Sequence, residues 1–434
     1  MDELLGEDFA VAEKDRLYRC LDRALPHKDE LCVFLKGRWK DLFNAPFEVL
    51  LYDLTSTYIE GEGEQMPKAK RGYSRDHRPD CLQLVVALVI TPEGFPIAYE
   101  VLEGNTRDTA TLRDFLKKIE TLYGKAQRVW VMDRGIPTEE ILQEMRSSNP
   151  PVYYLVGTPR SKLRAFHPSF ADQPWQKIRE SVEVKLMAQK DECWILAKSE
   201  GRKAKENAIR RRKLARLLRT LRAIRRNCRK RDVLLLRLGA AKQEAGSAYP
   251  FVEIQIPDPK QIPTPQNFKF ALKKEKLREA QFIDGHYLLR SNLAAEDPAV
   301  LWQRYMQLWQ IEGAFRSLKS DLGIRPIYHQ KQKRAEAHIL VAFLAYALSV
   351  ALKKRLEAHA PGLTPHAVLE KFASIQMLDV CLPTTDGRQL VMPRYTKPEK
   401  EHLLLLEKLK IQLPKQPPPR IRKNHQTTKL EAVL

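Results

Sequence analysis

The sequence predicts an α/β fold in which a mixed sheet is flanked by helices. Three apolar segments typical of strands, at 47–52, 83–90 and 96–101, are followed by a helical pattern at 109–123 and a fourth strand at 128–132. Short strands and one strongly basic helix occupy 146–296, and helical periodicity returns after 297. We therefore expect a sheet with flanking helices, interrupted by a β-rich insertion that carries a basic helix.

Composition and charge indicate a globular protein with an anionic partner. The chain has 434 residues, 43% of them hydrophobic, which is enough for two or three cores. A formal net charge of +21 favours nucleic acid as the partner, and an anionic membrane surface is the alternative. The longest apolar run, 339–352, is shorter than the ~20 residues that span a bilayer, and the acidic start MDELLGEDF differs from a signal peptide. We expect an intracellular protein that does not contact a membrane.

The first half of the chain places two aspartates after apolar strands. Residues 1–46 have helical patterns, and the strand at 47–52 is followed by Asp53. A turn at 91–94 joins the second and third strands into a hairpin, and the fourth strand stops at Asp133. An aspartate after a buried strand is unfavourable unless a cation or hydrogen bonds compensate it, and open sheets build their sites at strand ends. The alternative is that each aspartate forms a turn or caps a helix.

The insertion at 146–296 contains the most basic segment of the chain, at 203–231. Leucine and isoleucine recur there at helical spacing between many arginines, which predicts an amphipathic helix. We expect four of the arginines to contact DNA phosphates: Arg211, Arg212, Arg216 and Arg219. The alternative is a solvated helix that packs only through its leucines.

A long helix is predicted over 301–322. Asp297 is a plausible N-cap, Pro298 suits the first turn, and glycine and proline at 323 and 326 end the helix. Residues seven apart drift by only about 20° around a helix, so Tyr305, Glu312 and Lys319 are expected to share one stripe, which Arg316 joins. Such a stripe suits a site that holds metal and phosphate together, and a solvent-exposed face with salt bridges is the alternative.

The remaining segments contain few candidate site residues. A second helix at 335–356 is expected to be buried, and 359–434 is predicted to form a helical segment with a proline-rich tail. His329 and His338 are interpreted as structural rather than as metal ligands. Six cysteines form no C-x-x-C pair, which disfavours a zinc site or a disulfide framework.

With these residues in place, the chain resembles the DDE transposases of bacterial insertion sequences, in the broad IS-four-like group. The resemblance rests on blocks at 53–57, 104–108, 132–135, 284–285 with 289–292, and 305–319. The signature Y-x2-R-x3-E-x6-K is matched by Tyr305, Glu312 and Lys319, but Leu308 stands at the arginine position. Leucine cannot make the phosphate contact that the signature arginine implies, and Arg304 or Arg316 is available to replace it.

The resemblance implies a fold, a set of site residues and an activity. It implies a ribonuclease-H-like core, at 47–145 and 297–358, in which Asp53, Asp133 and Glu312 bind two Mg²⁺ or Mn²⁺ ions. Tyr305 and Lys319 are expected to contact the DNA backbone, and Arg134 is a further candidate. The implied activity is cleavage and strand transfer at the ends of a mobile element, on double-stranded DNA, by a homodimer in the cytoplasm of a bacterium, associated with the nucleoid.

Two alternatives to this activity stay open. The first is a ribonuclease-H-like nuclease that cuts without strand transfer. The second is a catalytically inactive DNA-binding remnant, because only about fifty residues precede Asp53 and the family usually has a longer N-terminal region.

Overall fold

The computed structural model describes residues 14–423, apart from 108, 110, 160–161, 164, 166–169, 171–172, 228–229 and 294–295. The acidic start of the chain and the last residues of the predicted tail lie outside the described residues. The chain divides into two compact units, of which one comprises Met1–Arg128 with Gln307–Leu434 and the other comprises Val129–Met306.

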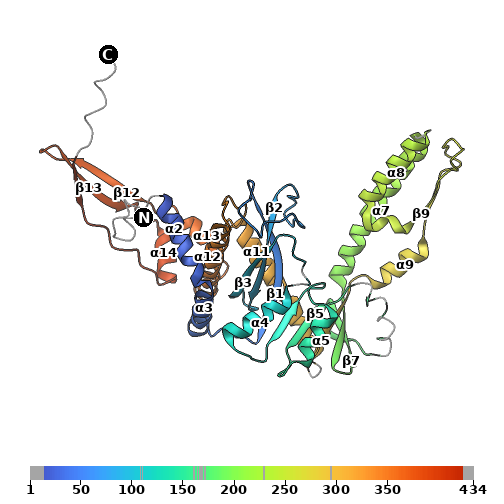
Figure 1. The fold of residues 1–434 in the computed structure, drawn as a ribbon, viewed down its shortest axis with the longest axis horizontal. Coiled ribbons are helices and arrows are strands. Elements are labelled where there is room, and N and C mark those ends of the chain that lie inside the picture. Colours follow the sequence, from blue (N-terminus) through green and yellow to red (C-terminus); the bar gives the residue numbers. More distant parts are fainter. Residues whose placement is uncertain are drawn as a thin grey trace, which may run out of the picture. The chain divides into compact units, whose positions relative to one another are not determined.

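The first unit contains an antiparallel run of strands in the order β3-β2-β1. These are β1 (Val49–Ile59), β2 (Leu82–Ile90) and β3 (Pro96–Glu103), which are labelled in Figure 1. Most of their side chains are buried. The turn at 91–94 confirms the predicted hairpin, because the Thr91 amide donates to the Phe95 carbonyl at 2.9 Å and Gly94 has a φ of 94°.

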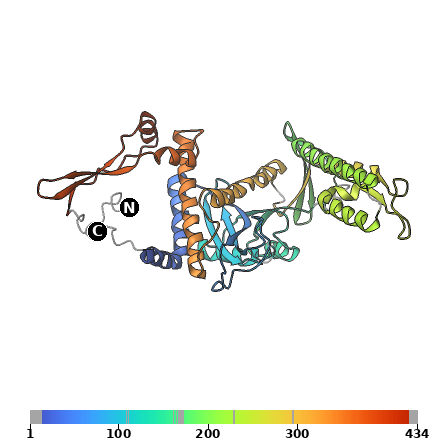
Figure 2. The ribbon, with the colours of Figure 1, turned by 90° about the horizontal axis from the view of Figure 1, so that it is seen from above.

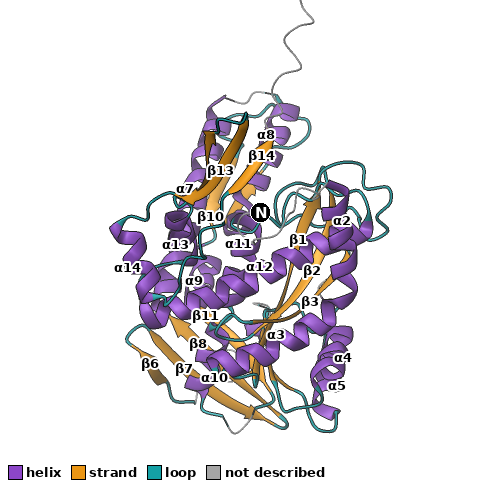
Figure 3. Ribbon diagram, turned by 90° about the vertical axis from the view of Figure 1, so that its left-hand side faces the viewer, coloured by secondary structure: helices purple, strands orange, loops and turns teal. Residues whose placement is uncertain are grey.

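Helices cover these strands, which explains why the strands are apolar on both sides. Helices α3 (Lys28–Phe43) and α12 (Gln332–His359) contact β3, and α11 (Trp309–Ser320) contacts β1 and β2 (Figure 3). The predicted helix at 109–123 is α4 (Leu112–Tyr123), with Leu112, Phe115 and Ile119 buried. Among the described residues of this unit, further helices are α2 (Lys14–Ala24), the short Leu25–His27, α13 (Pro365–Phe372) and α14 (Lys400–Lys408).

Helix α12 is the apolar helix that was predicted to be buried. By length and composition alone it is long and apolar enough to cross a membrane, but half of the apolar window is buried inside the protein. Phe343 packs beside Tyr99 of β3 with ring centroids 4.7 Å apart, and the Tyr346 hydroxyl donates to the Gly94 carbonyl at 3.0 Å. These contacts are typical of a core helix.

The C-terminal part of the first unit contains strands that the sequence analysis did not predict. They are β12 (Met377–Pro383), β13 (Arg388–Tyr395) and β14 (Arg420–Lys423), which form an antiparallel sheet in this order. The expectation of a helical segment is met only by α13 and α14.

The second unit contains a mixed run of strands in the order β4-β5-β11-β8-β7-β6. Strands β4 (Val129–Met132) and β5 (Tyr153–Gly157) are parallel, whereas β11 (His286–Ser291) is antiparallel to both β5 and β8 (Glu192–Ser199). Strands β7 (Val182–Gln189) and β6 (Gln176–Arg179) complete the run. Helices α5 (Glu139–Ser147) and α10 (Pro298–Met306) pack against these strands.

The basic segment of the insertion forms α7 (Glu200–Asn227), and α8 (Arg231–Ala245) lies beside it (Figure 2). The leucines of α7 bury themselves against apolar residues spaced three or four apart on α8, such as Leu234 and Leu238. A small hairpin of β9 (Val252–Gln255) and β10 (Lys269–Leu272), with α9 (Lys274–Ile283), continues this part of the unit. The basic helix is thus confirmed, whereas α8 was not predicted.

The predicted fold class is confirmed. The protein is an α/β protein with a mixed sheet, flanking helices and an insertion that carries a basic helix. The prediction of one helix over 301–322 is wrong, because α10 ends at Met306 and α11 begins at Trp309. Asp297 caps α10 as predicted, with the Ala299 amide donating to its carboxylate at 2.9 Å.

Candidate functional site

Asp53 lies inside β1, so the expectation that it ends the first strand is wrong. The strand continues to Ile59 because its next polar side chains are buried and hydrogen-bonded. The Thr57 hydroxyl donates to the Ile324 carbonyl at 3.0 Å, and the Ser56 hydroxyl accepts from the Arg75 amide at 3.0 Å. Asp53 itself is half-buried and accepts from the Leu54 amide at 2.8 Å.

Glu312 lies in the first turn of α11, in the same unit as Asp53. The face of α11 about a quarter turn from Glu312, with Ile311, Phe315 and Leu318, is buried. Glu312 and Arg316 are exposed, and neither side chain has a hydrogen-bond or ion-pair partner within the part of the chain that the structure describes. A carboxylate in the first turn of a helix interacts favourably with the helix dipole, and that of Glu312 is open to solvent.

The segment that follows α11 is tied to the end of β1. The Ile327 amide donates to the Tyr58 carbonyl at 3.0 Å, and the Glu60 amide donates to the Ile327 carbonyl at 2.9 Å. Together with the apolar face of α11, these bonds fix the helix that carries Glu312 against the strand that carries Asp53.

Lys319 forms an ion pair that the sequence analysis did not identify. Its Nζ donates to Asp76 Oδ1 at 2.8 Å, and Arg325 pairs with the same oxygen. The Asp76 side chain is only 3% exposed, and burial lowers the pKa of Lys319 while Asp76 opposes that shift. Two cations therefore converge on one buried carboxylate, at a loop whose position no local sequence signal predicted.

Asp133 lies directly after β4, as predicted, and is exposed. The Tyr305 hydroxyl, on α10 of the same unit, donates to Asp133 Oδ1 at 3.1 Å. Burial, followed by the negative charge of Asp133, raises the pKa of Tyr305, so the phenol stays protonated and remains a donor. Gly157 makes room for this contact, because a Cβ at that position would lie 2.5 Å from the Tyr305 oxygen. Arg134, next to Asp133, is exposed.

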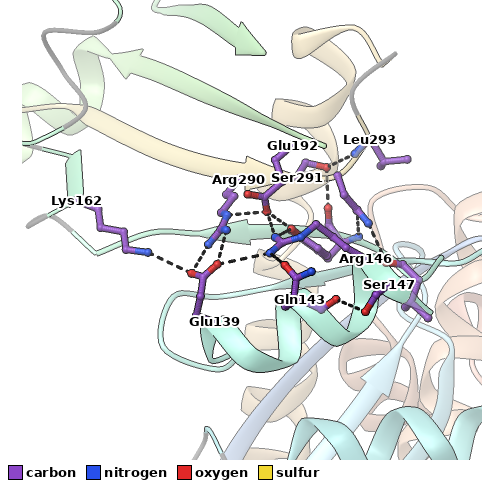
Figure 4. Close-up of polar contacts among 12 residues, drawn as sticks. Glu139, Gln143, Arg146, Ser147, Lys162, Glu192, Arg290, Ser291 and Leu293 are labelled. Carbon is purple, nitrogen blue, oxygen red and sulfur yellow. Dashed lines mark hydrogen bonds and ion pairs between the residues drawn. The ribbon is translucent and has the colours of Figure 1, made fainter. Parts of the chain in front are cut away.

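A partly buried ion network holds α5, the helix that follows the Asp133 loop (Figure 4). Arg290 of β11 donates two hydrogen bonds to Glu139, at 2.6 and 2.7 Å, and a third to Glu192 at 2.7 Å. Arg146 of α5 also pairs with Glu192. Arginine binds carboxylates in this forked geometry most strongly, so the start of α5 is fixed to the sheet.

The arginines predicted on the basic helix all lie on α7 and are exposed. Arg216 forms an ion pair with Glu244 of α8. The side chains of Arg211, Arg212 and Arg219 have no partner among the described residues. Their charge therefore faces solvent and is available to an anion.

The break between α10 and α11 separates residues that were expected to share one helical stripe. Tyr305 belongs to α10 and the second unit, whereas Glu312 and Lys319 belong to α11 and the first. The structure thus groups Tyr305 with Asp133, and Glu312 with Asp53. The prediction of one continuous stripe is wrong.

The carboxylates match a hard divalent cation in their chemistry. Asp53, Asp133 and Glu312 offer oxygen donors, which Mg²⁺ and Mn²⁺ prefer, and none of the three is fully buried. Among the described residues, no three His, Cys, Asp or Glu side chains are gathered closely enough to hold a metal ion. His329 and His338 pack against each other at 5.5 Å, and burial lowers the pKa of both rings.

Comparison with known proteins identifies one family. A family model described as "Transposase DDE domain" matches residues 45–348, which is more than half of the chain. No curated protein matches the chain. A solved piggyBac transposase, in a synaptic complex with hairpin DNA, is similar with a TM-score of 0.38 and 7% identity, over 72% of this chain and 48% of that one. The chain spans about half the length of that protein.

Proposed function

The chain belongs to the family of transposase DDE domains, and from that premise we propose that it cuts DNA at the ends of a mobile element and joins those ends to target DNA. The observation that carries the proposal is the family match, since the matched residues include Asp53, Asp133 and Glu312. The net charge of +21 supports double-stranded DNA as the substrate.

Asp53, Asp133 and Glu312 are the proposed metal ligands. Two bound Mg²⁺ or Mn²⁺ ions would supply Lewis acidity to the attacking and leaving oxygens of an in-line displacement. The chain supports the ligand role with features of its own. Asp53 is held in a strand, Glu312 is exposed in the first turn of a helix, and the Tyr305 hydroxyl leaves the second oxygen of Asp133 available.

The proposed DNA contacts come from both units. Lys319 and Arg316 on α11, with Tyr305 and Arg134 near Asp133, would bind the backbone close to the cut. The exposed arginines of α7 would bind phosphates further along the duplex. A homodimer is proposed as well, because two element ends have to be joined in one synaptic complex.

The test is a strand-transfer assay with pre-cut element ends and a supercoiled target, in Mg²⁺ or Mn²⁺. Asp53→Asn, Asp133→Asn and Glu312→Gln are each expected to abolish cleavage and joining while DNA binding is retained. Asp191→Asn removes an exposed carboxylate from the turn between β7 and β8 and is expected to retain full activity.

The outcomes separate the proposed function from its alternatives. Metal-dependent cleavage without any joined product would identify a nuclease. If the wild type binds DNA but cuts nothing, and the three variants bind equally well, the chain is a DNA-binding remnant and the proposal is wrong.

A further inference from the structure

A buried ion pair holds the first part of α7 against the sheet of the second unit. We call this part, residues 200–210, the root of α7. Arg210 contacts Asp284 through both terminal nitrogens, with Nη1 at 2.7 Å from Oδ2. The side chain of Asp284 is 1% exposed and that of Arg210 is 11% exposed. Asp284 directly precedes the turn into β11, so this pair joins the basic helix to the strand beside β5. Asp284 belongs to the sequence block at 284–285 and 289–292, to which the proposed function assigns no role.

A second set of bonds reinforces the same junction. The Gly285 amide donates to Glu206 of α7 at 3.1 Å, and its carbonyl accepts from the Ser199 amide at 2.9 Å. Gly285 has a φ of 79°, and a Cβ there would lie 2.6 Å from the Ser199 carbonyl oxygen. Only glycine fits this position, so the junction is built for close contact between the helix and the turn.

Aromatic contacts continue from the root of α7 to the partner of Asp133. The Arg202 guanidinium lies over the Tyr287 ring, 3.7 Å from its centroid. Tyr287 packs edge-on against Trp302 of α10, with centroids 5.2 Å apart. One helical turn beyond Trp302, Tyr305 donates its hydrogen bond to Asp133. Packed side chains therefore connect the basic helix to the aspartate within one unit.

Small rotations at this root would have large effects at the far end of the helix. From Arg210 to Asn227 the helix rises about 25 Å, at 1.5 Å per residue. A tilt of about 10° at Arg210 would move the far end by about 4 Å, which exceeds the ~3.4 Å rise of one nucleotide. Holding the exposed arginines toward the far end of α7, such as Arg222 and Arg226, in register with Asp133 thus requires a rigid root.

We propose that Asp284 is a positioning residue, which fixes α7 through Arg210 so that DNA bound by the helix is presented to Asp133 in a single register. This inference rests on the proposed function. It assigns Asp284 no contact with DNA or metal. It makes the accuracy of cutting depend on a buried ion pair remote from the phosphodiester.

The experiment compares Asp284→Asn with the wild type in three measurements. Amide hydrogen exchange is expected to accelerate over the root of α7 and the turn at 283–285, while the apolar core between α7 and α8 keeps its protection. DNA affinity is expected to stay within about twofold with an unchanged salt slope, because the exposed arginines are intact. Cleavage sites, mapped on end-labelled duplex, are expected to spread over several nucleotides.

Two further variants control the experiment. Glu244→Gln removes the exposed ion pair to Arg216 on the same helix and is expected to leave exchange at the root and the cleavage site unchanged. If Asp284→Asn does not fold, Arg210→Lys keeps the charge but loses the forked geometry, and the same spread of cleavage sites is expected.

Unchanged exchange at the root, or a single sharp cleavage site in a folded variant, would overturn the proposal. A uniform loss of protection, with weaker DNA binding, would show an ordinary structural role and would also overturn it. Failure of the proposed function gives a different result. If the wild type cuts no DNA, the proposed function is wrong and Asp284 has no cleavage to position. Hydrogen exchange at the root of α7 still shows whether Asp284 anchors the helix.

Discussion

Gly157 shows how a single missing side chain shapes the surroundings of Asp133. The hydroxyl end of Tyr305 lies where a Cβ at this position would come too close, 2.5 Å from the oxygen, and from there the hydroxyl donates to Asp133. Gly157 does not have a positive φ, so the requirement for glycine comes from the close approach of the ring.

Gly157→Ala is therefore expected to destabilise the protein by about 1–3 kcal/mol, because the added methyl has to displace the Tyr305 ring. Thermal unfolding provides the measurement. Gly239→Ala is the matched control, since Gly239 is exposed on α8 with no atom within 4 Å of the added Cβ, and it is expected to stabilise by about 0.5–1 kcal/mol. Equal unfolding temperatures for the two variants would contradict this account of Gly157.

Glu139 makes stability depend on pH in acid. Hydrogen bonds from Arg290 lower the pKa of Glu139 from 4.5 to about 2. Because the folded-state pKa is depressed, the stabilisation is complete above pH 4.5 and is lost as the pH falls toward about 2. Glu139 is 56% exposed, so solvent screening keeps the contribution small.

The prediction concerns the difference in the free energy of unfolding between wild type and Glu139→Gln. The wild type is expected to be more stable in urea above pH 4.5, and the gap is expected to close between that pH and about 2. Glu183→Gln, which removes a carboxylate from a looser pair with Lys198 at 3.7 Å, is the control. A gap that is independent of pH would contradict the role assigned to the Arg290 bonds.

Some of the individual site residues could be predicted from the sequence and others could not. Asp133 was predictable because an apolar strand directly precedes it. Asp76 and Gly157 were not, because their roles depend on partners 243 and 148 residues away in the chain. No local pattern records such contacts.

Among the elements, strands and amphipathic helices were predictable from periodicity, whereas breaks and partners were not. The hairpin of β2 and β3, helix α4 and the basic helix α7 follow their apolar patterns closely. The break between α10 and α11 contains neither proline nor glycine, so local helix signals continue through it. The predicted end of β1 came too early. The polar residues in its second half form hydrogen bonds with groups that are distant in the sequence, which no local pattern records.

Helix α7 makes a prediction about the salt dependence of DNA binding. Replacing Arg211, Arg212, Arg216 and Arg219 with glutamine is expected to weaken binding to all sequences alike. The slope of log affinity against log salt is expected to flatten by about 0.9 for each phosphate contact that is lost. Arg216 should contribute least, because it already pairs with Glu244.

The control for this prediction removes the same charge from another element. Four exposed lysines of the C-terminal region are changed to glutamine: Lys400, Lys408, Lys410 and Lys415. Fluorescence anisotropy on a labelled duplex, at several salt concentrations, compares the two sets. If both sets flatten the slope equally, net charge rather than α7 accounts for the binding.

For the molecule as a whole, the family was predictable from motifs that lie far apart in the chain, but the division into units was not. The proposed metal ligands come from both units, two from the first and one from the second. The chain passes between the units twice, after Arg128 and again at the break after α10, where the helix with the partner of Asp133 ends and the helix that carries Glu312 follows. Because the helical pattern continues without interruption over 301–322, the sequence does not indicate this boundary.

The most direct test of the central claim is iron-mediated cleavage of the polypeptide, with Fe²⁺ in place of Mg²⁺ in the DNA-bound protein. Radicals produced at the bound ion cut the backbone nearby, so the fragments report which segments share it. We predict fragments ending near Asp53, Asp133 and Glu312, and the loss of all three in Glu312→Gln. Fragments near only two of these residues, or an Asp133 fragment that persists in Glu312→Gln, would contradict a metal site shared by the three carboxylates.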